Sequence, residues 1–351
     1  MTSARRGIAR RAARGIASVI TILAPVLVGT SAAYAIEPKP FYEGKQVTIV
    51  VGNPAGSGYD AYARLVARHL GKHLPGSPGF IIQNMPGAGS IVAAQFLSNV
   101  AAKDGTIIGL LVPGAFFEPL IEDESKFHYS PGKFEFIGSA DSGTRLCFTT
   151  RDSGIKTIAD ASKGKVIVAS TAPQSSATDY ANFMNVLAGT KFQVVMGYKG
   201  PADLLLAMER GEAAGVCALD SATLASIRPD WIETGKVNLL VQAGLEADPA
   251  IKAPPIWDYI KGDNRPVAEL IVGQQEFGRP FVAPPGTPKA QVKTLQTAFM
   301  ATMRDPQLVA EAGKMRIGVK AKSGEEIAAI VRKMYDSPPE LVARVKKTLR
   351  P

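Results

Sequence analysis

Within the short segment Val47–Leu70, the spacing of the apolar residues changes from one period to another. Apolar residues crowd together at Val47–Val51, which predicts a buried strand of a parallel sheet. The glycine-rich segment Gly52–Gly58 follows, and from Asp60 onwards the apolar residues recur at helical spacing. A glycine loop between a strand and a helix exposes backbone N–H groups beside the positive end of the helix dipole. The element therefore favours an anion at its loop.

The same pattern recurs immediately downstream. Phe80–Ile82 predicts a second strand, Asn84–Ser90 a second glycine loop and Ile91–Ala102 a second helix. Thr106–Val112 predicts a third strand, which the turn Pro113-Gly114 ends. The order β-α-β-α-β is typical of a parallel sheet with crossover helices. Because the carboxyl ends of parallel strands meet at one edge of the sheet, we expect both loops to converge there.

The second half of the chain predicts a second α/β unit. Phe134–Ser139 and Arg145–Thr150 are strand-like, and the polar segment between them marks the crossing. Beyond it the alternation restarts, with predicted strands and helices at Lys165–Ser170, Ala177–Leu187, Phe192–Met196, Asp203–Arg210, Ala214–Leu219 and Val237–Ala243. The remaining elements are loops at Pro254-Pro255 and Lys261–Pro266, a returning strand at Arg279–Pro284, and helices at Gln291–Met303, Pro306–Met315, Gly324–Tyr335 and Pro339–Leu349.

The first 35 residues have the pattern of a secretory signal peptide. Five arginines precede the apolar core Ile16–Gly29, and Ala33-Tyr34-Ala35 supplies a small-residue cleavage site. We expect cleavage after Ala35. The alternative is a membrane anchor, for which the apolar run is short and is interrupted by Pro25.

Charge and hydropathy narrow the range of partners. Removing the five leader arginines from the net charge of +9 leaves +4. No long basic run is interleaved with aromatic residues, so nucleic acid is not an expected partner. No apolar stretch after Ala35 is long enough to span a bilayer, so we expect an exported, soluble protein. We interpret the basic residues of the final helix pattern, Arg344, Lys346, Lys347 and Arg350, as a solvated face.

The two cysteines, Cys147 and Cys217, lie in strand-like apolar runs. The interpretation we favour is two buried thiols that pack as small hydrophobic side chains. The alternative is a single disulfide, which an exported protein can form.

The sequence shows no recognisable set of catalytic residues. Gly56–Ala61 fits the G-x-G-x-x-A fingerprint of dinucleotide sites, but Asn84 stands where the ribose-binding acid is expected. His69 and His73 have the i, i+4 spacing that can hold a metal, yet no third ligand is evident nearby. Neither a G-x-S-x-G elbow nor a Walker loop occurs. We therefore expect binding without turnover, with no cofactor and no resident metal, rather than a secreted enzyme.

A hydroxyl-rich loop precedes the predicted helix Ala177–Leu187. Its side chains Ser170, Thr171, Ser175 and Ser176 are suited to donate hydrogen bonds to carboxylate oxygens. Helix capping is the ordinary role of such residues and accounts for one of them. The surplus hydroxyls predict a contribution to a ligand site.

The order of these motifs resembles that of the solute-binding receptors of tripartite tricarboxylate transporters, the Bug family. The segments VTIVVGNPAGSGYDAYARLVARHL, NMPGAGS and KDGTIIGLL occur in the family's order. They are followed by GYKG with ADLLLAMERGEAAGV, and by FVAPPGTPKAQVKTLQTAF with RDPQLV. The similarity extends from about Val47 to Tyr335.

This resemblance implies a two-lobed α/β fold of the type II periplasmic binding class, each lobe a mostly parallel sheet flanked by helices. Domain 1 would comprise residues 36–141 and 277–351, and domain 2 residues 142–276. The implied function is capture of a small organic carboxylate between the lobes by a periplasmic monomer. It would deliver the carboxylate to a permease with two integral membrane subunits. The alternative is a sensing receptor that passes its loaded state to a signalling partner.

The resemblance also implies the ligand-contact positions. In domain 1 these are Ser57, Gly58, Tyr59, Asp60, Gly87, Ala88, Gly89, Ser90, Gly114 and Ala115. In domain 2 they are Ser170, Thr171, Gln174, Ser175, Ser176 and Asp220. We expect Asp60 to tie its loop, because a carboxylate repels an anion. Gln174 is larger than the glycine of the family's loop, and Asp220 could either bind a ligand ammonium or cap a helix. In the implied topology the strands of the two cysteines are antiparallel neighbours, which makes a bridge conceivable.

Overall fold

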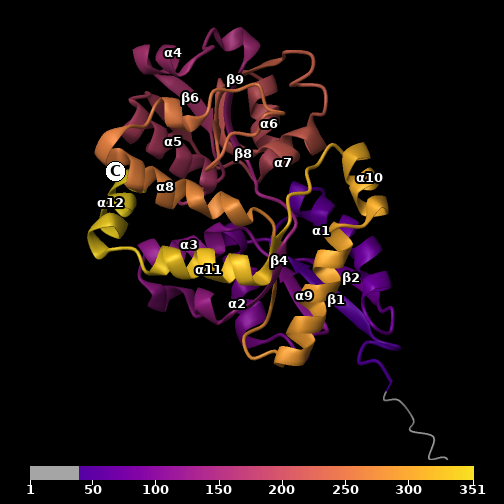
Figure 1. Cartoon of the computed structure of the whole chain (residues 1–351). Helices are drawn as coiled ribbons and strands as arrows, with labels where there is room; N and C mark the ends of the chain where they lie inside the picture. Colours follow the sequence, from indigo (N-terminus) through magenta and orange to yellow (C-terminus); the bar gives the residue numbers. More distant parts are fainter. Residues whose placement is uncertain (1–38) are drawn as a thin grey trace, which may run out of the picture. The chain divides into compact units, whose positions relative to one another are not determined.

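Two β-sheets organise residues 39–351, which are the residues that this computed structural model describes (Figure 1). The predicted signal peptide and its cleavage after Ala35 lie outside these residues. Within the described part of the chain, no helix combines the length and the apolar character that crossing a membrane requires.

The first sheet has six strands in the order β11-β4-β10-β3-β1-β2. Strand β1 pairs in parallel with both β2 and β3, whereas β10 is antiparallel to β3 and β4, and β11 is antiparallel to β4. The strands are β1 (Gln46–Val51), β2 (Gly79–Asn84), β3 (Ile107–Leu110), β4 (Glu135–Ser139), β10 (Pro280–Ala283) and β11 (Lys322–Ser323). The chain therefore returns to its first sheet after completing the second.

The second sheet has five strands in the order β7-β6-β8-β5-β9. Strand β6 is parallel to β7 and β8, and β5 is antiparallel to β8 and β9. The strands are β5 (Arg145–Thr150), β6 (Val166–Ala169), β7 (Phe192–Val195), β8 (Gly215–Asp220) and β9 (Val237–Ala243). Both sheets are thus mixed, with a parallel group extended by antiparallel strands.

Twelve α-helices flank these sheets within residues 39–351. They are α1 (Gly58–Leu70), α2 (Ile91–Asn99), α3 (Gly114–Ile121), α4 (Ile158–Lys163), α5 (Ser176–Ala188), α6 (Pro201–Glu209), α7 (Ser221–Ile227), α8 (Arg265–Gly273), α9 (Lys289–Met303), α10 (Pro306–Lys314), α11 (Gly324–Tyr335) and α12 (Pro339–Leu349). Short 3₁₀ turns are η1 (Gly71–His73), η2 (Ala88–Ser90), η3 (Glu124–Phe127), η4 (Pro131–Lys133), η5 (Arg151–Ser153), η6 (Ile256–Asp258), η7 (Gly262–Asn264) and η8 (Gln274–Phe277).

The loop predicted at Lys261–Pro266 is wrong for most of its length. Residues Gly262–Asn264 form η7, and α8 begins at Arg265 with Pro266 in its first turn. Proline has no backbone N–H, and the first turn of a helix needs none. The same residue that suggests a loop therefore starts a helix here.

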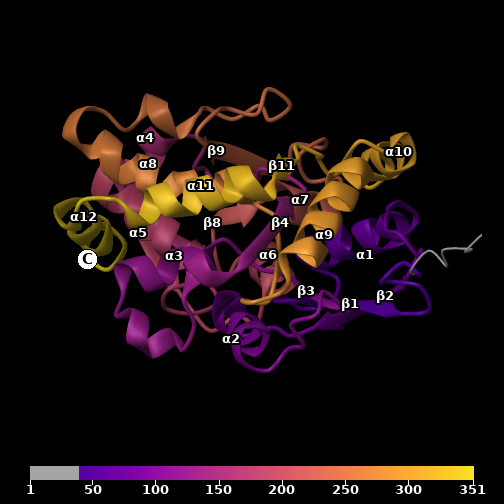
Figure 2. The same ribbon diagram turned by 60° about the horizontal axis from the view of Figure 1, so that its bottom comes forward.

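The apolar run of strand β1 is continuous because helices cover both faces of the strand. Val47, Ile49 and Val51 pack with α1 and α9 on one face, whereas Val50 packs with α2 and α3 on the other. A strand covered by helices on both faces has no solvent side to alternate with. Figures 1 and 2 show α9 and α10 beside α1, although these helices are far apart in the sequence.

One apolar core continues from the first sheet to the second. It joins Val50 and Phe116 on the first side to Tyr180 and Val241 on the second, with Val345 of α12 between them. Phe116 contacts three other aromatic rings, those of Phe134, Phe136 and Phe277, at centroid distances of 5.3 to 6.1 Å. The two sheets are consequently joined by packing as well as by chain connections.

The favoured interpretation of two free thiols is wrong, because Cys147 and Cys217 form a disulfide between β5 and β8. The β5–β8 register shifts by one residue between Leu146 and Phe148, and Ala218 takes a left-handed φ of 56° there. This bulge places the two sulfur atoms against each other. The bridge spans 70 residues of sequence, so by chain entropy it disfavours the unfolded chain by about 4 kcal/mol.

The two chain connections between the sheets touch at a pair of glycines. A Cβ atom on Gly278 would collide with the backbone N of Gly143. Gly278→Ala should therefore lower the free energy of unfolding by about 1–3 kcal/mol, because the backbones cannot approach as closely. Urea denaturation monitored by circular dichroism measures this loss.

The matched control is Gly313→Ala in α10, where an added Cβ meets no atom within 4 Å. Alanine favours a helix over glycine, so this variant should gain about 0.5–1 kcal/mol. Equal stability of Gly278→Ala and the wild type would contradict the crossing described here.

Candidate functional site

Three loops at the carboxyl ends of β1, β2 and β3 are tied together by Ser90. Its Oγ donates to the carbonyl O of Gly52 and accepts from the backbone N of Val112, each at 3.0 Å. The Ser90 side chain is fully buried, and a Cβ atom on Gly52 would collide with it. The glycine loops therefore converge as predicted, and Ser90 serves as the tie between them.

The predicted role of Asp60 in tying its loop is confirmed. Oδ2 accepts from Gly56 N and Arg64 Nε at 2.9 Å, and Oδ1 accepts from Asn84 Nδ2 at 3.1 Å. Burial by itself would raise the pKa of Asp60, but these hydrogen bonds hold it below the ordinary value. Ser57 caps α1, because its Oγ accepts from Asp60 N at 3.2 Å.

The second glycine loop has left-handed backbone at every residue from Gly87 to Ser90. The φ angles are 151° at Gly87, 44° at Ala88, 62° at Gly89 and 76° at Ser90. Ala88 and Ser90 are strained in this region, and such strain is characteristic of ligand loops. Ala88 and Gly89 are exposed, so their backbone is accessible.

In the start of α3, Gly114 is half-buried and Ala115 is fully buried. Ala115 N donates to Val112 O at 2.9 Å, and Ala115 O accepts from the Tyr129 hydroxyl at 2.6 Å. The helix begins directly behind the loop that Ser90 fastens. Its first turn therefore has a fixed position beside the two glycine loops.

The hydroxyls of the second sheet's loop bond mainly to one another. Ser170 Oγ lies 2.8 Å from both Ser175 Oγ and Thr178 Oγ1, and Thr178 Oγ1 donates to Ala172 O. Ser175 also caps α5 by accepting from Thr178 N. Ser170 is fully buried and so holds the loop from within.

The hydroxyl groups of Thr171 and Ser176 are not part of this network. Among the hydrogen bonds of residues 39–351, none involves either side-chain oxygen, and both residues are half-buried. The backbone N–H groups of Ser176 and Ala177 start α5 and have no acceptor within the helix. Gln174, at the tip of the loop, is exposed with a left-handed φ of 63°.

Asp220 is buried and faces a residue that the sequence pattern did not single out. Its Oδ1 accepts from Ala222 N and Thr223 N, which caps α7, and pairs with the guanidinium of Arg279. Asp220 is 2% exposed and Arg279 is 0% exposed. Burial would raise the pKa of Asp220, but Arg279 and then Arg145 hold it below its ordinary value. The capping alternative therefore describes Asp220 in this structure.

The Arg279 guanidinium also lies over two aromatic rings of α1. Its Cζ is 4.3 Å from the ring centre of Tyr59 and 4.8 Å from that of Tyr62. The Tyr62 hydroxyl donates to Asp141 Oδ2 at 2.8 Å. Burial raises the pKa of Asp141 to about 6. Arg279 thus joins α1 of the first sheet to the α7 cap of the second.

The first turns of α1 and α7 meet directly. A Cβ atom on Gly58 would lie 2.5 Å from Thr223 Oγ1 and 3.2 Å from its backbone N. Only glycine permits this approach. The structure therefore brings the α1 loop against the second sheet's side, next to the buried Asp220–Arg279 pair.

The histidine pair contacts two separate carboxylates of the α10 region. His69 Nε2 lies 2.7 Å from Glu311 Oε2, and His73 Nε2 lies 3.0 Å from Asp305 Oδ2. Within residues 39–351, no group of three or more His, Cys, Asp or Glu side chains is arranged to hold a metal ion. The two histidines therefore link α1 and η1 to carboxylates of the α10 region.

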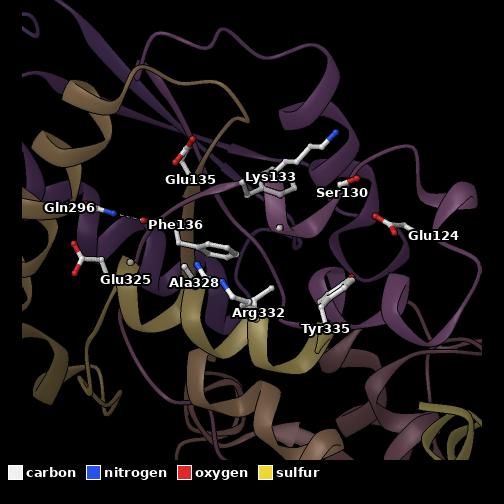
Figure 3. Close-up of a pocket in the computed structure, with 14 residues that line it drawn as sticks. Glu124, Ser130, Lys133, Glu135, Phe136, Gln296, Glu325, Ala328, Arg332 and Tyr335 are labelled. Atoms are coloured by element: carbon white, nitrogen blue, oxygen red, sulfur yellow. Dashed lines mark hydrogen bonds between the residues drawn. The ribbon is translucent and has the colours of Figure 1, made fainter. Parts of the chain in front are cut away.

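A hollow of about 550 Å³ lies elsewhere, between α11 and the segment from η3 to β4 (Figure 3). It is lined by Phe136, Arg332 and Tyr335, together with Lys133 and Glu135, and by none of the predicted site residues. Glu135 is already paired with Lys289. The loops at the strand ends remain the candidate site, because the strained Gly87–Ser90 backbone is tied there to the loops after β1 and β3.

These features define the class of protein as a binding protein of two α/β units with its candidate site at their facing strand ends. A family profile described as "Tripartite tricarboxylate transporter family receptor" matches residues 62–342. The chain therefore belongs to this receptor family, and the predicted resemblance is confirmed. Its members are transport receptors rather than enzymes.

Individual proteins agree with this assignment. A Cupriavidus necator protein described as "UPF0065 protein in gbd 5'region" is 26% identical over 290 residues, which cover 81% of this chain and 82% of that protein. An R. palustris protein solved with adipate has a TM-score of 0.67 at 20% identity, covering 86% of this chain and 97% of that one. MatC from Rhodopseudomonas palustris, solved with bound malate, has a TM-score of 0.63 at 20% identity, covering 87% and 99%. At this identity the structures support the fold.

The role of Ser90 as a tie predicts a loss of stability when its hydroxyl is removed. Ser90→Ala should lower the free energy of unfolding by about 1–3 kcal/mol, because Gly52 O and Val112 N lose a buried partner. Chemical denaturation measures the change, with Ser125→Ala on the exposed η3 as the control. A loss no larger than that of the control would remove Ser90 from this role.

Proposed function

We propose that this protein captures a small organic carboxylate between its two α/β units and delivers it to a membrane permease. The observation that carries the proposal is the convergence of strained glycine backbone and free helix N-termini at the strand ends. Such groups stabilise an anion through N–H donors and the helix dipole. Membership of the receptor family supports the same conclusion.

The proposed domains are residues 36–141 with 277–351, and residues 142–276. The return of β10 and β11 to the first sheet supports this discontinuous arrangement. Two connections at Ala140–Thr144 and Gly278–Arg279 would then act as the hinge for closure. A monomeric periplasmic receptor, exported by the predicted signal peptide, would present its closed form to the permease.

Direct contacts to the ligand are assigned to backbone N–H groups and to the two surplus hydroxyls. In the first domain these are the N–H groups of Gly87–Gly89, of the first turn of α1 and of Gly114 at the start of α3. In the second domain they are the Thr171 and Ser176 hydroxyls and the first turn of α5. Ser57, Asp60, Ser90, Ser170, Ser175 and Asp220 hold these groups in position through the hydrogen bonds described above. Gln174 stands at the edge and would restrict the size of the ligand.

A dicarboxylate fits this arrangement best. The helix N-termini lie on both sheets, so each carboxylate group of one ligand can meet its own set of donors. The similar structures solved with adipate and with malate hold molecules of this class. This assignment extends those observations to the present chain.

A thermal-shift screen of residues 36–351 tests the function. The panel contains adipate, malate, citrate, benzoate, glutamate and NAD. A ligand at about 100-fold its dissociation constant adds roughly 2.7 kcal/mol, which raises the Tm by several degrees. A shift with dicarboxylates supports the proposal, whereas a shift with NAD alone and no carboxylate would overturn it.

The two surplus hydroxyls provide the sharpest variants. Thr171→Val and Ser176→Ala should each weaken dicarboxylate binding about tenfold, because a hydrogen bond to a charged group contributes roughly 1.5–3 kcal/mol. Isothermal titration calorimetry measures the affinity. Ser162→Ala is the matched control, since its Oγ donates only to Ile158 O within α4. Wild-type affinity in both site variants would exclude the α5 loop from the binding site.

A further inference from the structure

A cluster of charged side chains outside the candidate site joins helices from the two sheets. The guanidinium of Arg350, which follows α12, donates to Asp179 of α5 and to Glu118 of α3, at 3.0 Å from Glu118 Oε2. Its Nε is 3.8 Å from Oε1 of Glu122, the residue that directly follows α3. Glu122 in turn receives Lys346 Nζ at 2.9 Å. We call these five residues the Arg350 cluster.

For Arg350, this cluster contradicts the interpretation of the α12 basic residues as a solvated face. Arg344, Lys346 and Lys347 are exposed and fit that interpretation, whereas the Arg350 side chain is 20% exposed and is engaged with acids. Helix α12 packs against α3, α5 and α8, which places it across both units (Figures 1 and 2). Asn182 Nδ2 of α5 adds a hydrogen bond to Leu349 O at 2.8 Å.

Both acidic helices begin at the proposed ligand site. Glu118 lies about one turn after Gly114 and Ala115, which start α3. Asp179 lies about one turn after the Ser175 cap and Ser176, which start α5. One guanidinium therefore holds the first turn of α5 and the middle of α3, two helices that start at the proposed ligand site.

The charges in the Arg350 cluster do not balance when every acid is ionised. Three carboxylates face two cations, and the side chains of Glu118 and Asp179 are only 11% and 10% exposed. Burial raises the pKa of Asp179 to about 7; Arg350 opposes this rise and the Glu118 carboxylate adds to it. Burial likewise raises the pKa of Glu118. A proton is therefore retained at this pair below about pH 7.

Other titratable groups on the packed elements are directed elsewhere. The Tyr129 hydroxyl donates to Ala115 O, and the Tyr180 hydroxyl accepts from Gln275. Arg344 donates to Asp263 O, and Arg265 of α8 pairs with Glu269. The proton balance of the cluster is thus set by its own three acids and two cations.

We propose that the Arg350 cluster is a proton-dependent latch that positions α3 and α5 for the ligand, so that binding weakens as the pH rises. Arg350 acts as a positioning residue, since it reaches the ligand only through these helices. The part of this inference that concerns ligand binding rests on the proposed function. The latch itself is measurable without any ligand.

The direction follows from proton counting. In the folded protein Asp179 keeps its proton up to about pH 7, whereas in the unfolded chain it loses it near its ordinary pKa. The native state therefore binds more protons than the unfolded state between these values, and stability falls as the pH rises through that range. Any state that separates α3 from α5 is favoured in the same direction.

The first arm of the experiment measures Tm between pH 5.5 and 8.5 without ligand. The wild type should lose several degrees between pH 6 and 8, and Asp179→Asn should lose clearly less. The control is Asp160→Asn on exposed α4, which should keep the wild-type slope. Burial also raises the pKa of Asp141. This residue is present in all three proteins, so it contributes equally to each Tm slope. An unchanged slope in Asp179→Asn overturns the latch.

Arg350 variants separate the latch from simple loss of packing. Arg350→Gln should be least stable at high pH, where both buried acids are charged, and adding Asp179→Asn should restore much of the Tm. Arg350→Lys should restore it only in part, because an ammonium cannot reach two carboxylates in a fork. A pH-independent loss in Arg350→Gln that Asp179→Asn does not relieve contradicts the proposal.

The second arm measures the affinity for malate and adipate at pH 6 and pH 8 by calorimetry. The wild type should weaken at least threefold at pH 8, and Asp179→Asn should not. If Asp179→Asn changes the pH dependence of Tm while the wild type and the variant show the same pH dependence of affinity, that result overturns the coupling between the latch and the ligand. Failure of both probes to bind counts against the proposed function, while the Tm arm still decides whether the latch exists.

Discussion

The buried guanidinium of Arg279 is the constraint on which the junction of the two units depends. Removing an arginine from water costs several kcal/mol unless its charge is compensated. Here Asp220 supplies the opposite charge, the rings of Tyr59 and Tyr62 supply two π faces, and Gly278 O accepts a further hydrogen bond. Asp220 ends β8, the two tyrosines lie on α1, and Gly278 belongs to the connection itself. Their positions are therefore mutually determined.

That constraint explains the geometry around it. Because Asp220 both pairs with Arg279 and caps α7, the first turn of α7 is held against the first turn of α1, where Gly58 faces Thr223. The two connections run close enough that a Cβ atom on Gly278 would collide with Gly143 N, and a Cβ atom on Gly143 would lie 2.9 Å from Asp220 Oδ2. The α1 loop, a part of the candidate site, is consequently joined to the second sheet by a buried ion pair rather than by surface contacts.

The candidate site is built mainly from backbone, and its polar side chains hold that backbone in place. Ser90 fastens three loops, Asp60 fastens its own loop, and Ser170 fastens the loop before α5. In the proposed function, this leaves N–H groups and helix dipoles to meet the anion. Arg350 links helices α3 and α5 through Glu118 and Asp179, each of which lies about one turn from the start of its helix.

The sequence by itself determined the strand–loop–helix order, the positions of the two glycine loops and the receptor family, because periodicity and turn chemistry act over short stretches of chain. It located the site's loops, but it did not assign the roles of their side chains. Tertiary structure decided that Ser170 bonds inward, that Cys147 meets Cys217 across a bulge, and that Arg279 and Arg350 find their acids. These partners are set by register and packing between distant segments, which no local pattern encodes.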